Sequence, residues 1–161
     1  MRAVSAEDER HLSRAIKLSR EHMEHGEGGP FGAVVARGDQ VLAEGWNQVT
    51  SANDPTAHAE VVAIRGACQA VGAFSLEGAT LYASCEPCPM CLASAYWARI
   101  SRIVYANTRE DAAAIGFDDA AIYAEIPKAP AERAIPTLRI PSAAAEAVFV
   151  AWLRKADRVA Y

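Results

Sequence analysis

The sequence lacks the features that would place it in a membrane, outside the cell or on a nucleic acid. None of its apolar runs approaches the roughly 20 residues of a membrane-spanning helix. Its first ten residues turn acidic where a secretory signal peptide needs an apolar stretch, which favours a cytoplasmic location. Its formal net charge is −4, whereas proteins that hold phosphate backbones usually carry a basic surface. This net charge does not exclude a small neutral substrate.

Internal repeats and low-complexity segments are absent as well. The 161 residues suit one domain that can bury a core without disulfide bonds. Apolar residues make up 52% and charged residues 22%, ordinary values for a globular protein. In a reducing compartment, the clustering of the few cysteines indicates metal binding more than disulfide formation. The four are Cys68, Cys85, Cys88 and Cys91.

The first hundred residues show alternating strand and helix patterns. Ser5 with Asp8 resembles a capping box, so we expect a helix that begins there and ends at residues 26–30. The apolar segments 33–36 and 41–46 indicate a β-hairpin. The expected elements that follow are a polar loop at 47–56, a helix at 58–71, a strand at 80–84, a helix at 88–99 and a strand at 100–105.

Beyond Thr108 the pattern loosens. Residues 126–130 resemble a hinge, residues 136–140 could form a last strand, and residues 142–156 have the pattern of a C-terminal helix. This order predicts an α/β fold with three layers, in which helices cover both faces of a mixed, roughly five-stranded central sheet. We expect one domain over residues 1–161, with 127–161 as its C-terminal segment.

Two short motifs predict a metal centre. His58-x-Glu60 and Pro87-Cys88-Pro89-Met90-Cys91 supply the zinc ligands His58, Cys88 and Cys91. Three protein ligands leave a tetrahedral zinc ion one open position for water, which is typical of catalytic sites. Cysteines three apart at a helix start can point to one spot, where the helix dipole favours thiolate. The two motifs together are the signature of zinc-dependent nucleobase deaminases, with Glu60 as proton carrier.

Other uses of these cysteines remain open. In a structural zinc site, Cys85 could be the fourth ligand, and the protein could be a zinc-stabilised interaction module without activity. That interpretation leaves Glu60 and the proline before Cys88 unexplained. An iron–sulfur run would need a cysteine at position 95, where the sequence has Ala95, so this alternative is weak.

Longer segments carry a resemblance to a known family. Residues 56–60 and 84–91 resemble the cytidine deaminase superfamily, and the segments 28–35, 53–60, 96–99 and 116–119 resemble the small bacterial guanine deaminases. The resemblance implies the cytidine deaminase-like fold, one zinc ion per subunit, and hydrolysis of guanine to xanthine and ammonia by a zinc-activated water with Glu60 as proton shuttle.

The same resemblance implies which residues contact the substrate. Asp119 would assist proton transfer, and its carboxylate would suit the N–H donors of guanine. The implied substrate contacts are Phe31, Asn47, Trp97 and Tyr161. Local roles remain open for several of these residues: Phe31 and Trp97 as core residues, Asn47 as a turn residue, and Asp119 as a helix cap.

The resemblance also implies a homodimer in which the C-terminal segments are exchanged between subunits. The prolines between 127 and 141 fit a hinge for such an exchange. We expect a small-molecule purine base as substrate, and neither a nucleic acid nor a membrane as partner. The alternatives are tRNA adenosine deamination, which needs a basic groove, and deamination of cytosine or another aminated heterocycle.

Overall fold

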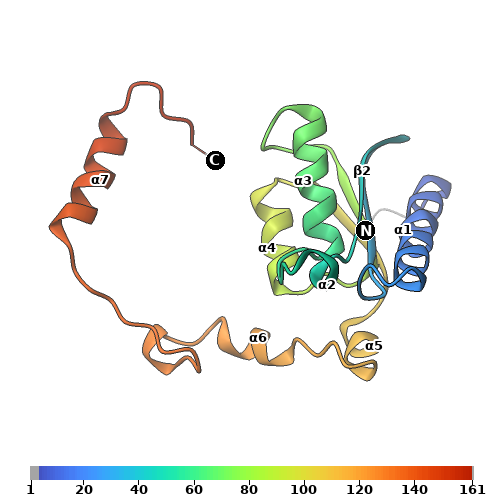
Figure 1. Cartoon of the computed structure of the whole chain (residues 1–161). Coiled ribbons are helices and arrows are strands. Elements are labelled where there is room, and N and C mark those ends of the chain that lie inside the picture. Colours follow the sequence, from blue (N-terminus) through green and yellow to red (C-terminus); the bar gives the residue numbers. More distant parts are fainter. Residues whose placement is uncertain (1–3, 161) are drawn as a thin grey trace. The chain divides into compact units, whose positions relative to one another are not determined.

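The computed structural model describes residues 4–160, and the chain divides into two compact units, residues 1–119 and 120–161. Figure 1 shows their elements. Those of the first unit are α1 (Ala6–Glu24), β1 (Gly32–Arg37), β2 (Gln40–Trp46), α2 (Val49–Ala52), α3 (Ala59–Val71), β3 (Thr80–Cys85), α4 (Pro89–Trp97), β4 (Arg102–Asn107) and α5 (Arg109–Ala114). The second unit holds α6 (Ala120–Glu125), a 3₁₀ turn at Pro130–Glu132 and α7 (Ala143–Arg154).

The sheet is mixed and has the strand order β2-β1-β3-β4. Strand β1 runs antiparallel to both β2 and β3, whereas β3 and β4 run parallel. Four strands are found in the part of the chain that the structure describes, so the expected fifth strand at residues 136–140 was wrong. Pro136 has no N–H to donate to a ladder, and another proline follows directly at 141.

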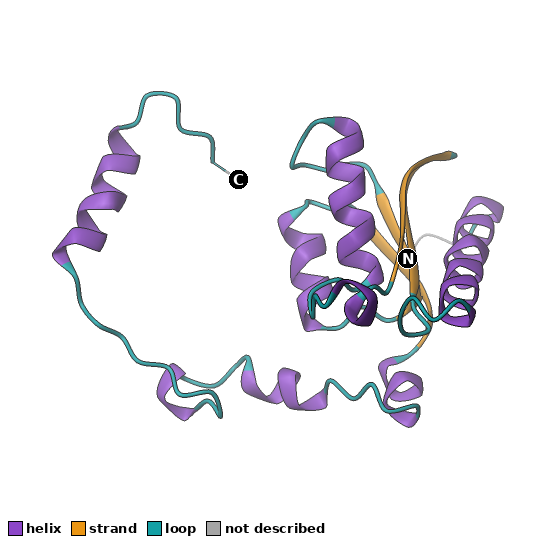
Figure 2. Cartoon of the chain, viewed as in Figure 1, coloured by secondary structure: helices purple, strands orange, loops and turns teal. Residues whose placement is uncertain are grey.

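Helices cover both faces of this sheet, as Figure 2 shows, and the expected three layers are confirmed. On one face Val34 and Ala36 pack with Ala15 and Leu18 of α1. On the other face Ala33 and Val35 pack with residues of α3 and α4. Successive side chains of a strand point to opposite faces, and both faces of β1 are buried. Residues 32–36 of β1 are therefore apolar, and the strand ends at the exposed Arg37.

A buried carboxylate joins α1 to the sheet. The Ser5 hydroxyl accepts a hydrogen bond from the Asp8 N–H, and Asp8 accepts one from the Ser5 N–H, which confirms the capping box. Asp8 also accepts hydrogen bonds from Arg102 of β4 at 2.6 Å and from the Tyr82 hydroxyl of β3 at 3.0 Å. The Arg102 guanidinium holds the pKa of Asp8 well below its usual range. Burial, reinforced by Asp8, raises the pKa of Tyr82 to about 12.

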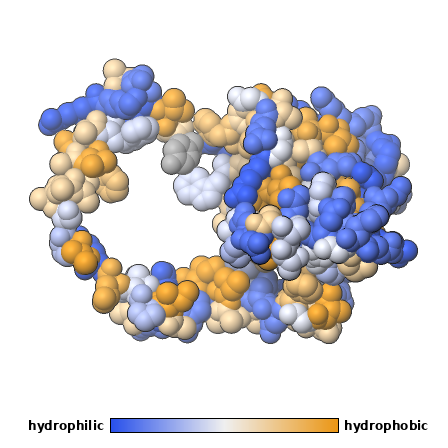
Figure 3. All heavy atoms as spheres, viewed as in Figure 1, coloured by the Kyte–Doolittle hydropathy of each residue, from blue (hydrophilic) through white to orange (hydrophobic). Residues whose placement is uncertain are grey.

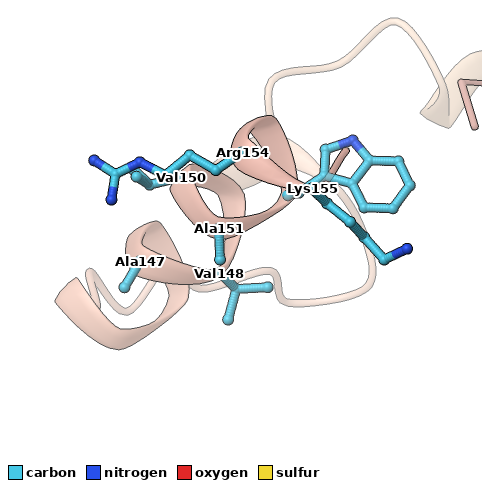
Figure 4. Close-up of a pocket in the computed structure, with 7 residues that line it drawn as sticks. Ala147, Val148, Val150, Ala151, Arg154 and Lys155 are labelled. Carbon is cyan, nitrogen blue, oxygen red and sulfur yellow. The ribbon is translucent and has the colours of Figure 1, made fainter. Parts of the chain in front are cut away.

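The second unit has no core of its own. None of the residues 120–160 is buried, and α7 exposes large apolar side chains such as Phe149 and Leu153. Figure 3 shows hydrophobic residues at the surface of this unit. Side chains of α7 from Ala147 onward, together with Lys155 just after the helix, line a depression along it (Figure 4). Within residues 4–160, no helix is both long enough and apolar enough to cross a membrane.

Candidate active site

The candidate site lies at one edge of the sheet. The pairings Gly32 with Trp46, Ala33 with Ala83, and Cys85 with Asn107 show that β1 begins at the edge where β2, β3 and β4 end. The segments that enter or leave the strands at this edge carry three of the residues singled out from the sequence. They are Phe31 in the turn before β1, Asn47 after β2, and Cys88 in the loop between β3 and α4.

A close backbone contact brings the start of α3 to this edge. A Cβ at Gly45 of β2 would lie 2.3 Å from the Ala59 carbonyl oxygen and 2.6 Å from the Ala63 nitrogen. Only glycine allows this approach. Helix α3 therefore lies directly on β2, and its first turn, with His58 and Glu60, sits next to the end of that strand.

Two helix N-termini supply the metal ligands. His58 is the N-cap residue of α3 and Cys88 that of α4, and neither side chain caps its own helix. Instead, His58 Nδ1 lies 3.6 Å from Cys88 Sγ and 3.5 Å from Cys91 Sγ, and the two sulfurs are 3.6 Å apart. Among residues 4–160, these three form the group of side chains that could hold a metal ion.

These separations fit zinc. A tetrahedral ion with Zn–S distances of about 2.3 Å and a Zn–N distance of about 2.0–2.1 Å separates its ligand atoms by about 3.6–3.8 Å. Cys85 is not part of the group, because its thiol lies 3.4 Å from the Thr108 carbonyl oxygen and donates to it. Burial raises the pKa of Cys85 to about 11. The geometry therefore offers three ligands rather than a closed set of four.

The ligands interact strongly with one another even as a bare set. The hydrogen bond with Cys91, together with one from His58, lowers the pKa of Cys88 to about 4. The same hydrogen bond with Cys88, together with burial, raises the pKa of Cys91 far above its usual range. The Cys88 contact also raises the pKa of His58. A cation bound between the two sulfurs would favour the thiolate form of both cysteines.

Glu60 is a buried carboxylate next to these ligands. It lies in the first turn of α3 and is 7% exposed. Burial raises the pKa of Glu60, and a hydrogen bond from its own backbone N–H only partly opposes that rise. A carboxyl group with a raised pKa takes up and releases a proton more readily at neutral pH than a surface carboxylate does.

The residues expected to contact the substrate differ in their burial and in their partners. Asn47 is 6% exposed, and its side-chain oxygen accepts hydrogen bonds from the backbone N–H groups of Gly29 and Val49, both at 3.2 Å. Asp119 is half-buried, and burial raises its pKa, with a further contribution from the neighbouring Cys88. Trp97 ends α4 with 66% of its surface exposed, so it is not a core residue of this unit. Tyr161 lies outside the described residues.

Sequence reasoning missed Phe117 as a neighbour of the site. Its ring meets the ring of Phe31 edge-to-face, with the ring centres 4.9 Å apart. Phe31 is half-buried by this contact, two residues after Gly29. The glycines at 28 and 29 were the available signal, because adjacent glycines often mark a close approach of backbone to another group.

The comparisons with known proteins agree with this geometry. Residues 5–107 match the family model of the cytidine and deoxycytidylate deaminase zinc-binding region. The chain is 49% identical to the guanine deaminase of Bacillus subtilis strain 168 over 150 residues, which span 93% of this chain and 96% of that protein. It is 38% identical to the tRNA-specific adenosine deaminase of the same organism over 99 residues, 62% of this chain and 61% of that one.

Solved structures give the same result. The X-ray structure of guanine deaminase from Bacillus subtilis superposes with a TM-score of 0.92, covering 95% of this chain and 98% of that one. A guanine deaminase from Nitrosomonas europaea is 29% identical and has a TM-score of 0.67, with 73% and 68% of the two chains covered. With three side chains positioned to hold a metal ion, this chain belongs to the zinc-binding cytidine and deoxycytidylate deaminase family, as a homologue of guanine deaminase.

Proposed function

We propose that the protein hydrolyses guanine to xanthine and ammonia. Water adds at the amino-bearing ring carbon, the C–N bond to the amino group breaks, and a carbonyl group remains. The observation that carries the proposal is the three-ligand set His58–Cys88–Cys91 with the buried Glu60 beside it. The likeness to a guanine deaminase along nearly the whole chain supports this choice of substrate.

The chemistry divides between the metal and the side chains around it. His58, Cys88 and Cys91 would hold the zinc ion, which when bound lowers the pKa of a water molecule to about 7. Glu60 accepts the proton of the attacking water at its carboxylate and then delivers protons to a ring nitrogen and to the leaving amine. Its burial supports this role, because it brings the pKa of Glu60 closer to the working pH.

The remaining residues would recognise the base. Asp119 faces the N–H donors of guanine and assists proton transfer, for which its raised pKa is suited. Asn47 hydrogen-bonds the base, and Phe31 and Trp97 pack against its flat face, as aromatic side chains do with bases. Tyr161 would complete the pocket. A pocket whose polar groups pair with one base and stay unpaired with another discriminates strongly between them.

The assembly that we propose is a homodimer with exchanged C-terminal segments. Residues 120–160 contain no buried residue, yet α7 carries several large apolar side chains, so this segment needs a surface to cover it. A proline-spaced connection such as that between 127 and 141 suits an exchange of terminal elements. We further propose a role in purine catabolism and a cytoplasmic location, which the four free cysteines favour.

The rival substrates have weaker support. A tRNA deaminase needs a basic surface for the phosphate backbone, whereas this chain has a net charge of −4. The test is ammonia release from guanine, adenine, cytosine and their nucleosides, with xanthine identified as the second product. Activity on guanine alone supports the proposal. Activity on a pyrimidine, together with none on guanine, overturns it.

The exchanged tail has a separate test. A zinc-loaded protein that ends at Pro127 keeps the first unit and should lose guanine deamination, because the tail is needed to complete the site. Circular dichroism and zinc content serve as controls that the first unit remains folded. Full turnover by this shortened protein would exclude the tail from the mechanism.

A further inference from the structure

The turn between α1 and β1 is in unusually close contact with Asn47. A Cβ at Gly28 would lie 1.9 Å from the Asn47 carbonyl oxygen and 2.8 Å from its side-chain oxygen. Such separations are far shorter than van der Waals contact, so position 28 has no room for any side chain. In addition, the Asn47 N–H donates to the Phe31 carbonyl oxygen at 3.0 Å. The turn and the end of β2 are therefore held together backbone to backbone.

Two hydrogen bonds, one of them from the same turn, fix which way the Asn47 amide points. The two hydrogen bonds that its side chain makes within residues 4–160 both go to its oxygen, from the N–H groups of Gly29 and Val49. A backbone N–H can only donate, so the oxygen must face these groups. The amide nitrogen therefore points away from these two N–H groups, and on that side the Asn47 amide has only donors to offer.

The other side of the same turn supports the segment that carries Asp119. A Cβ at Gly29 would lie 3.2 Å from the Phe117 ring and 3.4 Å from the Phe31 ring. These two rings meet edge-to-face, and Phe117 precedes Asp119 by two residues. One pair of glycines therefore contacts both Asn47 and the aromatic pair next to the carboxylate.

We infer that Gly28 and Gly29 are positioning residues of the substrate site, which lock Asn47 as a pure donor toward an acceptor atom of the purine and seat the Phe31–Phe117 pair beside it. This inference rests on the proposed contact between Asn47 and the base. It extends that proposal because it assigns the direction of the hydrogen bond and the backbone contact that enforces it. The matching ligand atom is a ring nitrogen or a carbonyl oxygen with a free lone pair.

The main test is Gly28→Ala compared with Gly32→Ala in the full-length zinc enzyme. The control carries a similar steric conflict, 2.2 Å from the Ala15 carbonyl oxygen, but this conflict is with α1 and not with Asn47. We expect Gly28→Ala to raise KM for guanine by about tenfold or more, with kcat within about threefold. At matched thermal stability and zinc content, Gly32→Ala should leave KM within about threefold. Equal KM values in the two variants would show that the turn at Gly28 and Gly29 has only a structural role, and would overturn the inference.

A second variant keeps the inference testable if Gly28→Ala does not fold. Asn47→Asp has the same shape, and its carboxylate still accepts from Gly29 and Val49, but it offers no donor to the ligand. We expect its unfolding temperature to stay near that of the parent while KM for guanine rises by about tenfold or more. An unchanged KM overturns the inference. A parent enzyme that is inactive on guanine instead overturns the proposed function, so the two failures are distinguishable.

Discussion

The two units of the chain differ in where their apolar side chains lie. In residues 4–119, two sets of buried side chains fill the two faces of one sheet, and the ligands and Glu60 lie at the end of that packed structure. In residues 120–160, no side chain is buried although the apolar content of α7 is high. The first unit therefore has the means to fold and to hold a metal, whereas the second depends on a surface outside itself.

The largest expected effect comes from a substitution that prevents proton transfer in the first unit and leaves its fold unchanged. Glu60→Gln preserves the shape of the side chain but cannot carry a proton, so we expect kcat for guanine to fall by about 10²–10⁴-fold. Zinc content, measured by atomic absorption, should remain one ion per chain. Undiminished turnover would exclude Glu60 as the proton carrier and overturn this part of the mechanism.

A matched pair of leucines compares the packing of the two units directly. Leu81 of β3 is fully buried, whereas Leu138 in the second unit is 89% exposed. Under conditions in which the chain is monomeric, Leu81→Ala should lower the free energy of unfolding by about 2–5 kcal/mol. Leu138→Ala should change it by less than about 0.5 kcal/mol. Similar losses in urea denaturation would mean that the second unit is packed like the first.

Acid should weaken the first unit through Asp8. The pKa of Asp8 is lowered in the folded chain, chiefly by Arg102, so its contribution is present above about pH 4 and is lost as the pH falls through the folded value. We expect Asp8→Asn to cost about 2 kcal/mol at pH 7 and to flatten the decline in stability below pH 4.

The control for this prediction is Asp39→Asn, which alters an exposed ion pair with Arg10. Surface ion pairs contribute about 0–1 kcal/mol, so this variant should follow the parent across the pH range. Thermal unfolding between pH 2.5 and 7 measures both. If the unfolding temperatures of Asp8→Asn and the parent decline in parallel below pH 4, Asp8 is not the cause of the loss of stability in acid.

The smallest effect concerns the surface of α7. If an exchanged dimer covers this helix, Phe149→Ala should raise the dimer dissociation constant about tenfold, because a buried aromatic side chain is lost from the interface. Met23→Ala removes a similarly apolar, exposed side chain from α1 and serves as the control. Sedimentation velocity measures both. Identical dissociation constants would leave Phe149 outside the interface.

Most of the first unit could be predicted from its sequence, because its signals are local. The hairpin, the helix that ends at Gly72 and the Ser5 capping box each depend on neighbouring residues, and the structure contains all three. The ligand set was predictable because the two motifs fix His58, Cys88 and Cys91 at helix starts. The one-turn helix α2 inside the expected polar loop was missed, since a single turn leaves no periodicity.

The remaining differences depend on contacts that are distant in the sequence. The segment at 136–140 has the composition of a strand, but no described strand pairs with it. Trp97 was open to interpretation as a core residue because α4 is apolar, yet it lies on the outside of the unit. The contact of Gly28 with Asn47 joins positions 19 residues apart, and only the folded backbone brings them together.

The contact of Gly45 with Ala59 has a consequence for the dimensions of the site. Strand β2 leads into Asn47, which would bind the base, and α3 begins directly after His58, which would bind the metal. The distance between these two residues is therefore set by the backbone contact of β2 with α3. Backbone atoms in hard contact can neither be compressed nor change rotamer. The contact therefore fixes the distance between the base-binding and metal-binding parts of the site, and a methyl group added at position 45 would increase that distance.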